Sequence, residues 1–354
     1  MTSSLVTPKA TLGGFKSKLL ALAALVLLAG CSANPIYTTT GIVLSNYSEG
    51  EATPYVMQTS DTRMACSLGE GLDPLLYSFS RVTSAPDSTG SMLMLLAANC
   101  AEYDAWEEEL RYLRADYQGN VSAAKDARES MKRLNAQVAQ RRYQSFQRAM
   151  NAYDYDPSAE NADCPFLFED QDELTFMLGL LTGMQSIVND ANSGAMAGVP
   201  RNIAPQAERA AQCLDNEKWG GLPNAIRSLV WLLIPDTQPS LAPDPWRVFK
   251  DSSRLGIESG LRASMALEAV AAETFGRPDV LEDVLKRYVE SEDRFEVREE
   301  YRLVDKIAGE VMVFTSDKYW TANYGYRTPQ RFFGQLSEER PGEETEVMDL
   351  DSLL

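Results

Sequence analysis

The spacing of apolar residues between about Asp61 and Trp320 is the feature that most constrains the fold of this chain. In almost every segment of this stretch, apolar side chains recur at steps of three and four residues. A β-strand would instead alternate apolar and polar residues, and no convincing run of that kind is present. The sequence therefore predicts an all-α body over residues 60–320.

The clearest predicted element is a helical hairpin that turns at Gly119-Asn120, a pair that ends one helix and begins the next. Turning the chain here sets Glu107–Glu109 beside Lys132 and Arg133. The basic residues of the second helix, which alone would suggest phosphate binding, are therefore expected to form a solvated and locally neutralised surface. The apolar stripe of the hairpin comprises Leu93, Leu96, Cys100, Tyr103, Leu110, Leu113, Tyr117, Ala124, Ala127, Met131, Leu134 and Val138.

Further helices are predicted downstream of the hairpin, with prolines in the segments that connect them. The proline-rich stretch 235–245 is a possible boundary within the body. The predicted helices are Asp172–Asn189, Ala204–Leu214, Leu222–Leu233, Ser252–Phe275, Asp279–Glu290 and Glu299–Thr315.

Two helix ends share a pattern of apolar, aromatic and small residues before a proline. They are Leu75-x3-Phe79-x2-Val82-x3-Pro86 and Phe146-x2-Ala149 followed by Tyr153 to Pro157. The pattern approximates the second helix of a tetratricopeptide repeat, although no strict 34-residue period is present. The expected architecture is antiparallel helical hairpins stacked as a degenerate repeat array, or an irregular helical bundle.

The N-terminal leader predicts a membrane anchor. Lysines at positions 9, 16 and 18 precede the apolar run Leu19–Leu28, which is too short to span a bilayer stably. The following Leu-Ala-Gly-Cys, ending at Cys31, resembles the lipobox of bacterial lipoproteins, in which this cysteine carries the acyl chains. We expect residues 1–30 to be a signal peptide and residues 31–59 a tether with one short helix. The alternative is an ordinary secretory leader with Cys31 as a structural thiol.

Charge and composition restrict the possible functions. Without the leader, 30 basic residues face 51 acidic ones, and a net charge of −21 argues against nucleic acid as a ligand. Histidine is absent from all 354 positions, which excludes Ser-His-Asp catalysis and histidine metal ligands. We expect no cofactor, no metal and no catalysis. The alternative is a carboxylate-based envelope hydrolase acting on glycans, for which the pairs Asp154/Asp156 and Asp170/Asp172 are candidates.

Four cysteines remain besides Cys31, and an oxidising compartment favours disulfides. If the chain turns between Arg81 and Ser88, Cys66 and Cys100 lie at nearly equal distances from the turn, offset by about 4.5 Å. The pair Cys164–Cys213 follows only by elimination. Three connectivities are possible for four cysteines, and four buried free thiols are the alternative.

An aromatic cluster follows the last predicted helix and is the candidate surface for a partner protein. It spans the end of the body and the start of a C-terminal segment, residues 321–354, whose acidic end beyond Leu336 is expected to be disordered. The candidate surface residues are Tyr319, Trp320, Tyr324, Tyr326, Phe332 and Phe333.

The order of these features resembles the T-component lipoproteins of TRAP transporters, over about residues 60–315. It consists of a lipobox, a short tether, a helix such as Leu72–Thr83, the long hairpin, and a helix such as Leu261–Phe275 that runs into Asp279. The resemblance implies a non-catalytic scaffold or ligand-binding adaptor that associates with the periplasmic substrate-binding protein of the transporter. It supplies no ligand residue. Ser32 after the lipobox favours the outer over the inner membrane.

Overall fold

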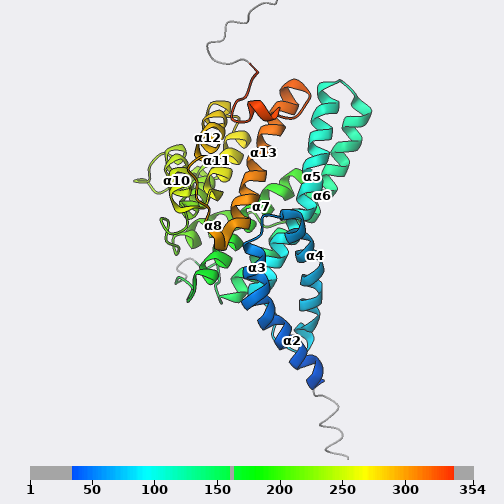
Figure 1. Cartoon of the computed structure of the whole chain (residues 1–354), viewed down its shortest axis with the longest axis vertical. Helices are drawn as coiled ribbons and strands as arrows, with labels where there is room; N and C mark the ends of the chain where they lie inside the picture. Colours follow the sequence, from blue (N-terminus) through cyan, green and yellow to red (C-terminus); the bar gives the residue numbers. More distant parts are fainter. Residues whose placement is uncertain (1–33, 160–162, 339–354) are drawn as a thin grey trace, which may run out of the picture.

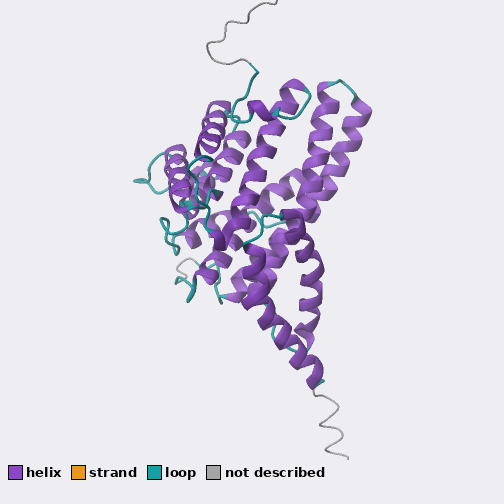
Figure 2. Cartoon of the chain, viewed as in Figure 1, coloured by secondary structure: helices purple, strands orange, loops and turns teal. Residues whose placement is uncertain are grey.

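The computed structural model describes residues 34–159 and 163–338, and throughout these ranges the protein is built from helices and loops without a strand (Figure 2). The all-α prediction is confirmed. The α-helices are α2 (Pro35–Tyr47), α3 (Thr53–Met57), α4 (Thr62–Ser78), α5 (Asp87–Tyr117), α6 (Val121–Ala152), α7 (Asp170–Ser193), α8 (Ile203–Ala211), α9 (Leu222–Leu233), α10 (Pro245–Ser259), α11 (Ala263–Thr274), α12 (Pro278–Ser291) and α13 (Arg302–Tyr324).

The predicted hairpin forms the longest pair of helices, α5 and α6, and is confirmed. The side chain of Asn120 accepts a hydrogen bond from the Ala123 amide at 3.1 Å and so caps α6. Helix α7 packs against α6, and α13 packs against both α5 and α11 (Figure 1). The hairpin therefore forms one side of a bundle whose other side is α9 to α13.

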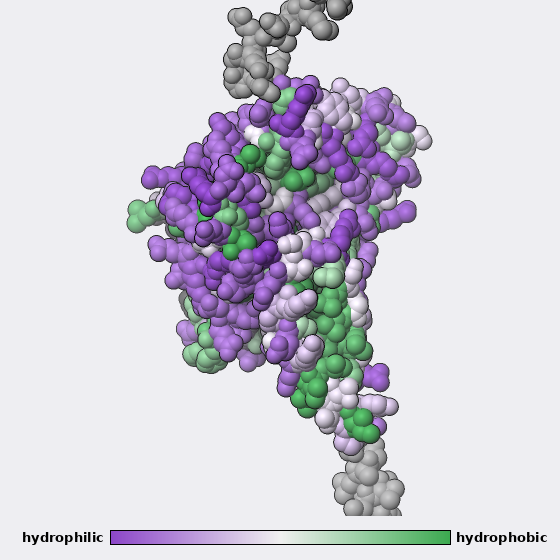
Figure 3. All heavy atoms as spheres, in the orientation of Figure 1, coloured by the Kyte–Doolittle hydropathy of each residue, from purple (hydrophilic) through white to green (hydrophobic). Residues whose placement is uncertain are grey.

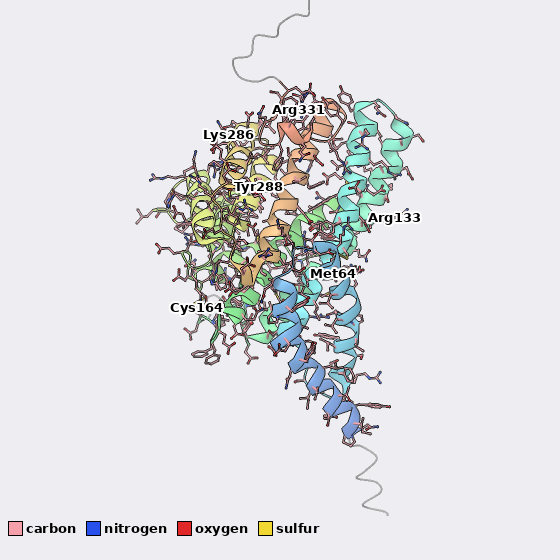
Figure 4. All side chains as sticks on the ribbon, in the orientation of Figure 1. Met64, Arg133, Cys164, Lys286, Tyr288 and Arg331 are labelled. Carbon is pink, nitrogen blue, oxygen red and sulfur yellow. A yellow bond between two sulfur atoms is a disulfide. The ribbon has the colours of Figure 1, made fainter. Side chains whose placement is uncertain are left out.

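The charges of the hairpin are arranged differently from the prediction. Glu107 and Glu109 form ion pairs with Arg327 and Lys318, which come from the C-terminal part of the chain. Lys132 instead pairs with Glu129 on its own helix. The expectation of a solvated basic surface holds for residues such as Arg133, which is exposed on α6 (Figure 4).

That expectation is wrong for Arg142, which is 4% exposed, because it faces the bundle interior. Residue 142 is on the same face of α6 as the buried Val138 and Phe146, four residues away on either side. Its charge is matched inside the bundle by Glu102 of α5. A basic residue on the apolar stripe was therefore mistaken for a surface residue.

A single hydrophobic core joins the two sides of the stretch 235–245. Its buried members run from Val56 to Leu336 and include residues of every helix from α5 to α13, with Phe249 from α10 among them. The possible boundary at 235–245 therefore does not separate two cores. This stretch contains a short turn, η3 (Pro235–Thr237), and leads into α10.

Two sequence-based boundaries require correction. The expected tether is helical from Pro35 to Met57, through α2, the π-helical turn η1 (Ser48–Ala52) and α3, and Val56 and Met57 belong to the core. The predicted helix Ser252–Phe275 is two helices, because Gly260 adopts a left-handed φ of 76° that ends α10. The predicted signal peptide, Cys31 and the tail beyond residue 338 lie outside the described residues. No described helix is long and apolar enough to cross a bilayer.

Candidate functional site

A cavity of about 400 Å³ lies inside the bundle, between α5, α7, α11 and α13. This volume is within the range of small-molecule sites in proteins. These four helices supply most of its aliphatic lining, because each carries an apolar face with three- and four-residue spacing. The aliphatic lining from these helices includes Met92, Leu95, Leu96, Leu178, Leu181, Met184, Val188, Ala266, Leu267, Val270, Leu303, Val304, Ile307, Ala308 and Val311.

One wall of this interhelical cavity is polar and internally hydrogen-bonded. The guanidinium of Arg142 donates to Glu102 and, through Nη1, to Asn189 Oδ1 at 2.6 Å. Asn189 Nδ2 in turn donates to Asn135 Oδ1 at 2.8 Å. This chain of bonds, from α5 through α6 to α7, compensates the burial of the Arg142 and Glu102 charges.

Three further amides line the cavity beside this chain: Asn99, Gln185 and Asn192. Asn99 is only 4% exposed, and its side chain makes no hydrogen bond to any residue that the structure describes. Buried amides are normally hydrogen-bonded, so Asn99 offers a donor and an acceptor to whatever occupies the cavity. The wall formed by Asn99, Glu102, Asn135, Arg142, Gln185, Asn189 and Asn192 is called the amide wall below.

A lysine between two carboxylates forms a second polar group in the lining. Lys318 Nζ lies 3.0 Å from Glu109 Oε1 and 2.9 Å from Glu273 Oε1. Burial alone would lower the pKa of Lys318, but the two carboxylates outweigh it and raise the pKa above its usual value. Lys318 and Glu273 also line a neighbouring pocket of about 280 Å³, so this cluster stands between the cavity and that pocket.

A stacked aromatic pair completes the lining near this cluster. The rings of Trp106 on α5 and Phe314 on α13 lie 4.4 Å apart and nearly parallel, at 8°. Both residues also line a further pocket of about 430 Å³ on the α5–α13 side. The aromatic pair therefore separates these two spaces.

The predicted partner surface at the end of α13 is largely internal. Trp320 is fully buried and Phe332 is 6% exposed, with ring centroids 5.9 Å apart, and Trp320 Nε1 donates to Gln335 O at 3.0 Å. Phe333 packs edge-on against Tyr288, which lies among the helices in Figure 4. The prediction is wrong for Trp320 and Phe332, because the chain after α13 folds back over their rings. Tyr319 and Tyr324 are half-buried, and only Tyr326 of the six is exposed.

Three of the four acids considered for catalysis, Asp156, Asp170 and Asp172, have local structural roles. Asp156 accepts hydrogen bonds from Ser158, which lower its pKa. Asp172 accepts from the Glu169 amide at 3.2 Å in the cap of α7, and Asp170 pairs with Lys218 at 2.8 Å. None of these acids lines the cavity. Within the described ranges, no group of three or more acidic or cysteine side chains could hold a metal ion.

Both expected disulfides are present. Cys66–Cys100 joins α4 to α5, with Cα atoms 5.3 Å apart. Cys164–Cys213 joins the loop before α7 to the turn after α8, with Cα atoms 5.5 Å apart, and Cys164 lies at the edge of the body (Figure 4). The two bonds hold the N-terminal helices and the α7–α8 connection to the bundle.

No protein-family model, curated protein or solved structure matches the chain. The resemblance to the T-component lipoproteins therefore stays a prediction from the order of sequence features.

The amide wall was missed by the sequence analysis, although a signal for it exists. Gln185, Asn189 and Asn192 follow the apolar residues of α7 at steps of four and three, on the face that the periodicity assigns to the core. A polar residue at a core position has to find a partner or line a cavity. These amides occupy positions of α7 where the spacing predicts apolar core residues, and this exception indicates an internal polar site.

Proposed function

We propose that the protein is an envelope lipoprotein that binds a small ligand in the interhelical cavity and serves as an adaptor without catalysis. The observation that carries the proposal is the cavity itself, because its lining is mainly aliphatic and most of its polar groups belong to the amide wall and the Lys318 cluster. Such a lining suits a ligand with an apolar body and a few hydrogen-bonding groups. Asn99 is the amide best placed to bind such a group.

We further propose that Cys31 anchors the protein by its acyl chains on the periplasmic side of the bacterial envelope, at the outer membrane. The support is the lipobox and the apolar leader before it. The proposed partner is the substrate-binding protein of a TRAP transporter. This assignment is supported by the order of helices in the sequence.

The carboxylates in the cavity favour binding over glycan hydrolysis. A glycosidase needs two carboxyl groups with room between them for the sugar or a water molecule. Glu109 and Glu273 are both paired with Lys318, whose ammonium group occupies the space between them. The absence of histidine from the sequence also removes the commonest general base at neutral pH.

The ligand-binding proposal is tested with a variant that fills the cavity. Ala266 of α11 is buried and lines the cavity, whereas Ala191 of α7 is exposed. Protein purified from its own membranes should retain a small molecule in native mass spectrometry. The Ala266→Phe variant should lose that molecule, while the matched control Ala191→Phe should keep it. Fluorescent apolar probes provide a second readout, and Ala266→Phe should abolish their binding. Ligand binding would be refuted if the wild-type protein retained no small molecule and also bound no such probe.

The partner is tested separately by cross-linking the acylated protein in native membranes and identifying the captured proteins. We expect the substrate-binding protein of a transporter to be enriched over a control lipoprotein. Recovery of no transport protein above that control would refute the assignment of the partner and leave the cavity proposal standing.

A further inference from the structure

The N-terminal helix α2 presents an uncharged, largely apolar face to solvent. Ile36, Thr40, Val43 and Tyr47 lie at steps of four, three and four residues and so share this face, called the outer face of α2 below. Ile36 is 70% exposed, Val43 58% and Tyr47 61%. Figure 3 shows a hydrophobic band over α2 and the N-terminal helices beside it, in contrast to the mostly hydrophilic surface of the body in the same view.

The opposite face of α2 fixes the helix to the body. Gly41 is buried against Phe79, so closely that a Cβ atom at position 41 would lie 3.0 Å from the phenylalanine ring. Thr38 Oγ1 donates to the Val82 carbonyl at 3.4 Å. These contacts leave the outer face of α2 directed away from the protein.

We propose that the outer face of α2 rests in the interfacial layer of a lipid bilayer, beside the acyl anchor. The inference rests on the proposed attachment of lipid at Cys31. Pro35 is four residues after Cys31, so the start of α2 lies at most about 14 Å from the cysteine Cα atom. Acyl chains in the bilayer therefore hold α2 at the membrane surface.

The length and charge of α2 fit this position. Its 13 residues form a helix about 20 Å long, enough to lie in the interface and too short to cross the hydrocarbon layer. Between Lys18 and Glu49 the sequence carries no charged residue. Tyr37 and Tyr47 are exposed on α2, and tyrosine side chains favour the boundary between lipid and water.

The charge of the remaining protein favours lipid over a second copy or an acidic partner as the occupant. The acidic body is repelled by anionic headgroups and by its own copies, whereas the neutral α2 is not. Figure 1 places α2 at one end of the molecule, opposite the end at which the described C-terminal segment leaves the body. Contact through α2 thus keeps most of the acidic surface away from the bilayer.

The first experiment uses the acylated protein in phosphatidylcholine liposomes. A Val43→Cys variant and a Leu241→Cys control are labelled with the polarity-sensitive dye NBD, since the four body cysteines are held in disulfides. Leu241 is 96% exposed in a loop of the body. We expect iodide in the water to quench the label at position 43 several-fold less than the label at position 241. Equal quenching at the two positions would overturn the proposal.

The second experiment separates the contact through α2 from the acyl anchor. The mature chain without acyl chains, beginning at Ser32, should float weakly with phosphatidylcholine vesicles. Val43→Asp should weaken that binding by about tenfold, because one buried aliphatic side chain is lost to the lipid. Leu241→Asp should leave it unchanged.

Each outcome of the two experiments discriminates between the ideas. If the intact mass of the mature protein showed no acyl chains, the anchor at Cys31 would be refuted. Flotation of the unacylated chain would still decide the role of α2. Flotation that is absent or insensitive to Val43→Asp would overturn the role of α2 and leave the anchor standing. Sedimentation of the unacylated protein without lipid tests for a dimer. If a dimer forms and Val43→Asp dissociates it, the outer face of α2 binds a second copy of the chain and not lipid.

Discussion

The buried ion pair between Arg142 and Glu102 makes a sharp prediction about stability. Its side chains are only 5% and 11% exposed, and the guanidinium also donates to Asn189. Replacing Arg142 by methionine keeps most of the side-chain volume but leaves the Glu102 carboxylate buried without its cation. Breaking such a pair costs about 3–5 kcal/mol. Because the cavity beside the pair can admit water, we expect the lower end, about 3 kcal/mol.

The neighbouring Arg141 provides a matched control. It pairs with Glu70, and the two side chains are 22% and 44% exposed, so Arg141→Met should cost about 1 kcal/mol or less. The double variant Arg142→Met/Glu102→Met should recover most of the loss, since two apolar side chains of similar size leave no charge uncompensated. Urea unfolding followed by circular dichroism, with the disulfides intact, measures all four proteins. A loss for Arg142→Met no greater than for Arg141→Met would refute the interpretation of the amide wall as a tightly coupled network.

Three further predictions concern other parts of the bundle. Replacing both Cys66 and Cys100 by serine should lower the free energy of unfolding by about 4 kcal/mol, as expected for a closed loop of 34 residues, and urea titration of the oxidised protein checks it. Trp320→Ala should cost about 3–5 kcal/mol in the same titration, because the ring is fully buried; a loss below about 1 kcal/mol would contradict its place in the core. Burial raises the pKa of Tyr288 to about 12, although Arg262 opposes the shift. The contribution of Tyr288 to stability is therefore complete below pH 10 and is lost as the pH rises to 12. Tyr288→Phe should remove about 2–3 kcal/mol of the alkaline destabilisation, and an unchanged pH profile of the melting temperature would refute the raised pKa.

The sequence was sufficient to predict the parts of the fold that depend on local spacing. The hairpin α5–α6 follows from one apolar stripe on each side of Gly119-Asn120, and the Cys66–Cys100 bond follows from two nearly equal distances to one turn. The break between α10 and α11 was missed because Gly260 interrupts a stripe that continues on both sides of it. Glycine in the middle of an apolar helix is tolerated often enough that its left-handed conformation here is decided by tertiary packing.

The cavity could not be predicted, because its lining comes from segments that the sequence does not relate to one another. The register of the hairpin set the cluster Glu107–Glu109 beside Lys132 and Arg133, yet the partner of Glu109 is Lys318 on the last helix. An ion pair of this kind depends on how α13 packs on α5, and helix periodicity carries no information about which faces meet. The amide residues gave a local signal, but their partners were likewise fixed only by the packing of α5, α6 and α7.

The proposed membrane contact and the proposed ligand site are linked through the N-terminal helices. Residues 35–57 form an almost continuous helical path, and Met57 at its end lines the cavity. At about 1.5 Å per residue this path is at most about 33 Å long, which is close to the thickness of the hydrocarbon layer itself. If α2 lies in the interface, the cavity is therefore held near the bilayer. A ligand with an apolar body would then have at most about 33 Å to cross between the interface at α2 and the cavity lining at Met57.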